Sequence, residues 1–147
     1  MPVDTTARGQ TETITFEFDL AHPPGKVWRA LTDPALVAEW LLPAAGLAPR
    51  PGTTFTLQAP PQPGWDGTVR CRVLAVEEER ALSYTWVVGD REIDTVVTFT
   101  LTPTASGTRL TLEHAGFEPE QRQAFGGARY GWRLMGDRLV DLLARTP

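Results

Sequence analysis

The stretch GGARYGWRLMGDRLVDLLA, residues 126–144, combines the apolar spacing of an amphipathic helix with four glycines. Large apolar side chains recur every three or four positions, which predicts one long helix over residues 127–145. Its buried stripe consists of Ala128, Trp132, Met135, Leu139 and Leu142. Each glycine inside a helix costs about 1 kcal/mol relative to alanine. A helix that only filled a core would not need them, so we predict that this helix closes over a hollow.

The four glycines predict two different features of the helix. Gly126 and Gly127 predict a kink or interruption near its start, which would let the preceding segment bend and gate one end of the hollow. A loop or loose packing at these two positions is the simpler alternative. Gly131 and Gly136 lie beside residues of the buried stripe, where a missing side chain lets the helix approach a sheet or a ligand closely.

Upstream of this helix, apolar and polar residues alternate with the period of half-buried strands. The runs with this pattern are residues 13–20, 54–59, 68–76, 81–88, 93–103 and 108–117. Short connections join most neighbouring runs, including a turn at Gly89 and Asp90, so the predicted sheet is antiparallel. Two short helices lie between the first and second runs. Pro23 and Pro24 precede one of them, and Asp33 is the expected N-cap of the other. The fold class is therefore α+β.

Composition limits the range of functions. The chain has 147 residues, 41% of them hydrophobic, which predicts a single domain over residues 11–147 with a flexible N-terminus at 1–10. The net charge of −4 and the scattered arginines argue against a nucleic-acid partner. Cys71 is the only cysteine, so no internal disulfide is possible. No apolar run approaches the ~18 residues of a membrane span, and we expect a cytoplasmic protein.

Three motifs resemble landmarks of a known family. They are PPGKVWRALTDPALVAEW at 23–40, GTRLTLEHAGF at 107–117 and GWRLMGDRLVDLL at 131–143. Together they are similar to the family of homologues of the activator of the heat-shock-protein-90 ATPase, within the START-like (SRPBCC) superfamily, over about residues 12–145. Trp40-Leu41 departs from the pattern, because the family often has two adjacent tryptophans there. The resemblance implies a helix-grip fold, in which a curved antiparallel sheet wraps a long C-terminal helix and encloses an apolar cavity.

The candidate lining of this cavity comes from the inward phases of the strands and from the long helix. Tyr84, Trp86 and Trp132 are the better aromatic candidates, because a hydroxyl or indole N–H in an apolar pocket would orient a ligand. The full set of candidate ligand-binding residues is Phe55, Cys71, Tyr84, Trp86, His114, Phe117, Arg129, Trp132 and Met135.

Three of these residues have a structural alternative. His114 follows the inward phase of its strand, and it is either a polar or basic group in the cavity or a structural histidine. Cys71 is favoured as a small buried hydrophobe, because Arg70 and Arg72 alternate to the opposite face and would not activate a thiol. Arg129 either meets a carboxylate at the cavity mouth or lies in solvent.

Chemistry beyond binding has less support. His22 and His114 are far apart in sequence, and there is neither a Cys/His cluster nor a glycine-rich phosphate loop. We therefore predict no metal and no cofactor, and we name no catalytic residue. The predicted function is binding of a small hydrophobic or amphipathic ligand. The alternatives are a cavity enzyme of the polyketide cyclase or hydrolase type, using His114, Tyr84 and Arg129, and a chaperone-interacting stress-response protein. A homodimer is left open.

Overall fold

The computed structural model describes residues 2–89 and 93–147. Within them, eight strands form one antiparallel sheet in the order β1-β2-β8-β7-β6-β5-β4-β3. The strands are β1 (Pro2–Asp4), β2 (Thr13–Leu20), β3 (Ala44–Ala45), β4 (Thr54–Gln58), β5 (Thr68–Glu77), β6 (Ala81–Val88), β7 (Ile93–Thr104) and β8 (Gly107–Ala115). The helices are α1 (Pro24–Thr32), α2 (Pro34–Trp40), the 3-10 turn η1 (Pro119–Gln121) and α3 (Arg122–Arg145).

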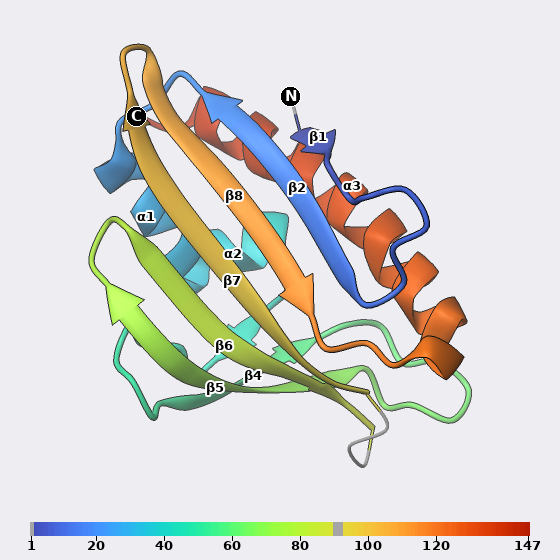
Figure 1. Ribbon diagram of the computed structural model, residues 1–147. Coiled ribbons are helices and arrows are strands. Elements are labelled where there is room, and N and C mark those ends of the chain that lie inside the picture. Colours follow the sequence, from blue (N-terminus) through green and yellow to red (C-terminus); the bar gives the residue numbers. More distant parts are fainter. Residues whose placement is uncertain (1, 90–92) are drawn as a thin grey trace.

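The sheet is a five-stranded meander from β4 to β8, extended at one end by β3 and at the other by β2 and β1. All three α-helices lie behind the curved sheet in Figure 1 and cover one of its faces. The alternating strands turn their apolar residues to this inner face, as in β2, where every second residue from Ile14 to Leu20 is buried. The predicted α+β helix-grip fold is therefore confirmed. Asp90, half of the turn predicted between β6 and β7, lies outside the described residues.

The two short helices form where their prolines and aspartate predict them. Pro24 opens α1, and the side chain of Asp33 accepts a hydrogen bond from the backbone N–H of Ala35 at 3.0 Å, which caps α2. The indole N–H of Trp40 donates to the backbone oxygen of Ala30 at 2.7 Å, so the end of α2 is tied to α1. Both helices thereby keep a fixed place over the inner face.

Helix α3 is continuous over 24 residues, which corrects the predicted kink at Gly126 and Gly127. A Cβ added at either position would meet no atom within 4 Å, so these glycines lie in open space and the flanking buried residues hold the helix together. Close approach does explain Gly136, where a Cβ would lie 3.0 Å from the Phe18 ring. It does not explain Gly131, where the nearest atom would be the methyl carbon of Met135 at 3.6 Å.

The N-terminus differs from the flexible segment that was expected. Residues 2–4 form β1, which pairs with residues 16–18 of β2. The carboxylate of Asp4 also meets α3, at 2.6 Å from Nε of Arg129 and 3.4 Å from a guanidinium nitrogen of Arg133. This strand therefore fastens the middle of α3 to the sheet. In the described part of the chain, no helix is long and apolar enough to cross a membrane.

Candidate functional site

A chain of aromatic rings fills the middle of the inner face. Phe55 on β4 meets Tyr84 on β6 with ring centroids 5.1 Å apart, and Tyr84 meets Phe99 on β7 at 6.1 Å. Phe99 then meets Trp132 of α3 edge to face at 6.2 Å. The strands and the long helix thus supply the aromatic surface together.

His114 lies at the centre of a directional hydrogen-bond chain. The indole N–H of Trp132 donates to Nδ1 of His114 at 2.9 Å, and Nε2 of His114 lies 2.7 Å from the hydroxyl oxygen of Thr95. The Thr95 hydroxyl donates onward to the backbone oxygen of Trp86 at 2.9 Å. An indole N–H can only donate, so Nδ1 must carry a lone pair, and a neutral imidazole must carry its proton on Nε2. The chain therefore specifies one tautomer.

This arrangement makes His114 structural. Only 1% of the residue is exposed, and burial lowers the pKa of its imidazole to about 3. Both ring nitrogens have partners, and the rings of Phe117 and Trp132 lie beside it with centroids 4.8 and 5.9 Å away. A histidine held neutral in this way does not take up a proton from a substrate. Of the two interpretations that its strand phase left open, the geometry matches the structural one.

Two donors on the inner face of β6 have no partner in the described part of the chain. They are the hydroxyl of Tyr84 and the indole N–H of Trp86. The indoles of Trp40, Trp65 and Trp132 have acceptors, whereas that of Trp28 in α1 also has none among the described residues. Every fully enclosed side-chain nitrogen or oxygen among the described residues has a partner. The unpaired hydroxyl of Tyr84 therefore borders a space that a water-sized molecule can reach, although the residue is only 3% exposed. Trp86 is itself half-buried.

The remaining inward candidates contribute apolar surface. Cys71 pairs with Phe55 across β4 and β5, and burial raises the pKa of its thiol to about 12. A thiol that stays protonated is a small hydrophobe, in line with the favoured interpretation. Phe117 packs edge to face on Phe125 at 5.4 Å, and Met135 packs against the core from α3.

Arg129 is not brought to this surface. Its guanidinium is engaged by Asp4 of β1, so a cavity-mouth role is replaced by a clasp between the N-terminal strand and α3. Asp4 and Arg129 are separated by 125 residues, and no local pattern in the sequence connects them. Among the described residues, no group of three or more His, Cys, Asp and Glu side chains is placed to hold a metal.

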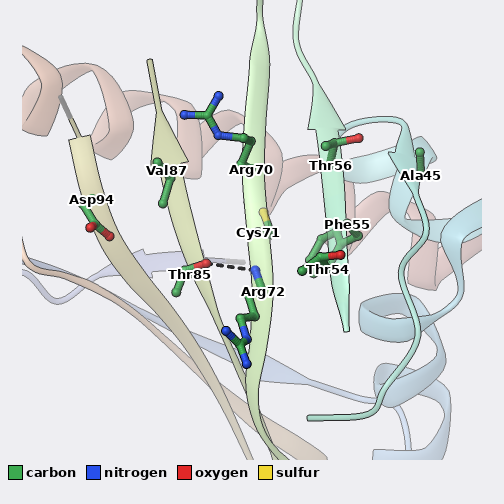
Figure 2. A pocket seen from close by; sticks show the side chains of 10 residues that line it. All are labelled: Ala45, Thr54, Phe55, Thr56, Arg70, Cys71, Arg72, Thr85, Val87 and Asp94. Carbon is green, nitrogen blue, oxygen red and sulfur yellow. Dashed lines mark hydrogen bonds between the residues drawn. The ribbon is translucent and has the colours of Figure 1, made fainter. Parts of the chain in front are cut away.

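A hollow lies on the outer face of the sheet, opposite the helices, and was not predicted. It has a volume of about 530 Å³ and is bordered by residues of β3 to β7. Figure 2 shows Arg70 and Arg72 leaving β5, with Thr54 and Thr56 of β4 on one side and Thr85 of β6 on the other. These residues alternate with the inward ones, so the sheet separates this hollow from Tyr84 and Trp86.

The fold and the aromatic inner face define a protein of the START-like (SRPBCC) helix-grip class. More narrowly, the chain belongs to the family described as Activator of Hsp90 ATPase homolog 1-like protein, whose model matches residues 21–144. The resemblance drawn from the three sequence motifs is thereby confirmed.

Solved structures of bacterial proteins are similar over almost the whole chain. The crystal structure of MLL2253 from Mesorhizobium loti has a TM-score of 0.84 and 45% identity, covering 92% of this chain and 98% of that protein. NE0264 from Nitrosomonas europaea has a TM-score of 0.75 and 27% identity, covering 95% and 99%. CalU16 from Micromonospora echinospora has a TM-score of 0.76 and 26% identity, covering 99% and 85%. No curated protein matches the sequence.

Proposed function

We propose that this protein binds a small, largely apolar ligand on the inner face of the sheet, against Tyr84 and Trp86. The observation that carries the proposal is the pair of unpaired donors on β6. Neither donor is fully enclosed, because every fully enclosed side-chain nitrogen or oxygen among the described residues has a partner, so both remain available to an incoming ligand. A ligand with carbonyl or hydroxyl oxygens would accept hydrogen bonds from these donors while its apolar body lay on the aromatic chain.

The inner face has few polar groups, and these would determine which ligands it accepts. Tyr84 and Trp86 are two residues apart on one strand, so their side chains leave β6 on the same face about 7 Å apart. Their neighbours Phe55, Phe99 and Cys71 are apolar or carry a protonated thiol. Such a surface favours a neutral amphipathic molecule over a charged one, because a charge would be buried without a counterion.

A cavity enzyme receives less support from the same geometry. The catalytic set considered from the sequence was His114, Tyr84 and Arg129. His114 has both nitrogens engaged, and Arg129 is bound to Asp4, so the three groups do not converge on one reacting atom. General acid–base catalysis requires that convergence. Binding is therefore the function that we propose.

Native mass spectrometry and thermal shift with a panel of fatty acids, aromatic polyketides and sterols test the proposal. We expect saturable binding of at least one class, and Tyr84→Phe should weaken it by about two- to tenfold, the worth of one hydrogen bond. Tyr130→Phe is the matched control, because Tyr130 is the other tyrosine and is 64% exposed on α3. Equal affinities for the two variants, or no binding across the panel, would overturn the proposal.

A further inference from the structure

The outer hollow is lined by several hydrogen-bond donors that play no part in the ligand binding proposed for the inner face. Arg70 and Arg72 are both exposed, and the guanidinium of Arg72 has no partner within residues 2–89 and 93–147. Arg70 donates to the backbone oxygen of Gly89. Neither guanidinium forms an ion pair within the described residues, which leaves two neighbouring cations on one surface of a chain whose net charge is −4.

Strand register places hydroxyl groups beside both cations. Thr54 lies directly opposite Arg72, and Thr56 lies directly opposite Arg70, on the neighbouring strand β4. On the other side, the backbone N–H of Arg72 donates to the hydroxyl oxygen of Thr85 at 2.9 Å, which leaves the Thr85 hydroxyl proton free to donate outward. Arg72 thus has a threonine on each side, and Arg70 has Thr56 on one side and Val87 on the other. The Cα atoms of the two arginines are about 7 Å apart along β5, and Figure 2 shows their guanidinium groups extending in different directions.

We propose that this outer hollow binds a small oxyanion, a phosphate or carboxylate group, held by the side chains of Arg70 and Arg72. Guanidinium groups bind such oxygens through paired, charge-assisted hydrogen bonds, and threonine hydroxyls supply further donors. The hollow of about 530 Å³ is within the usual size range of small-molecule sites and leaves room for the remainder of a ligand. This site is separate from the inner face and does not depend on the ligand proposed there.

Asp94 makes the charge of the outer hollow asymmetric. The register Arg70–Val87–Asp94 runs straight across β5, β6 and β7, so the carboxylate lies two strand spacings, about 10 Å, from Arg70. It is exposed and bears the opposite charge on the same hollow. A bound anion is therefore held toward β4 and β5, and the part of the ligand near Asp94 is expected to be neutral or to carry a hydroxyl or amino group.

The test is an NMR titration of the wild-type protein and four variants with inorganic phosphate, and separately with acetate, at low ionic strength. Arg72→Gln should weaken binding about tenfold, the worth of a hydrogen bond to a charged group, and Arg70→Gln should weaken it in the same direction. Asp94→Asn should tighten binding, because it removes a repelling charge within about one Debye length. Arg109→Gln is the matched control: Arg109 is a half-exposed arginine on β8, bound to Asp19 at 3.1 Å, and its loss should change nothing.

Saturable shifts at residues of β4, β5 and β6 with this order of affinities support the site, and the tighter of the two probes identifies the ligand group. Absence of saturation at millimolar concentration of both probes overturns it. Equal weakening by Arg109→Gln and Arg72→Gln also overturns it, because that result would reduce the effect to general surface charge. Melting temperatures of the variants show whether each remains folded, and none of these exposed side chains supports the core.

Discussion

Trp132 determines the tautomer of His114 through a single hydrogen bond from α3 to β8. The donor is an indole N–H and the acceptor is Nδ1, at 2.9 Å in a site where both residues are 1% exposed. Because Nε2 then donates to Thr95, one buried imidazole connects α3, β8, β7 and, through the backbone of Trp86, β6. The position of the long helix over the sheet is thereby coupled to the strand that carries the proposed ligand surface.

The stability of the protein should decrease as the pH is lowered through the range in which His114 titrates. Burial lowers the pKa of this imidazole from its ordinary value of 6.5 to about 3, so between these values the unfolded chain binds a proton that the native protein does not. The contribution is complete above pH 6.5 and is lost as the pH falls toward 3, and it amounts to roughly 5 kcal/mol at most. Urea unfolding at pH 7 and pH 4.5 checks the direction, and ¹⁵N shifts of His114 should show protonated Nε2 throughout. Protonation of native His114 near pH 6 would contradict the assignment.

Trp132→Phe should destabilise the protein and raise the pKa of His114. The substitution leaves Nδ1 buried without a donor, which costs about 1–3 kcal/mol, and it opens that nitrogen to a proton. Chemical denaturation and an NMR titration measure the two effects in one variant. Trp86→Phe is the comparison, because its indole N–H has no partner among the described residues and its loss should leave the pKa of His114 in place. A pKa that stayed near 3 in Trp132→Phe would show that the indole is dispensable.

The glycines of α3 should respond to alanine with opposite signs. Gly126→Ala and Gly127→Ala place a methyl group in open space on a helix, and each should stabilise the protein by about 0.5–1 kcal/mol. Gly136→Ala would put its Cβ 3.0 Å from the Phe18 ring and 3.3 Å from Pro2, and should destabilise it by about 1–3 kcal/mol. Melting temperatures of the three variants measure the sign of each change in stability. A loss of stability at Gly126 would mean that this segment opens in the native state.

Elements with a strong period were readable from the sequence. Residues 13–20 alternate without interruption, residues 82–86 alternate within 81–88, and both runs form strands with the predicted bounds. Asp33 caps α2 as expected, because the cap depends on residues adjacent in the chain. The aromatic inner face could also be predicted, since the inward phase of each strand and the stripe of α3 follow from periodicity alone.

Features that depend on distant partners were not readable. Residues 2–4 are too few to show a period, and β1 is held by pairing with β2 and by the contact of Asp4 with Arg129. The two open glycines suggested a break that packing on either side overrides. The outer hollow gave no signal, because threonine and arginine on the polar face of a strand look the same whether that face is flat or hollow.

The indole N–H region of a ¹H–¹⁵N NMR spectrum tests the proposed ligand surface most directly. The five tryptophans give five signals, and the indole of Trp86 is the one expected to gain an acceptor when a ligand binds the inner face beside Tyr84. Titration with the molecule selected by the binding panel should shift the Trp86 signal strongly, while that of Trp40, bonded to Ala30, stays in place. A Trp86 signal unchanged at saturation would contradict the account.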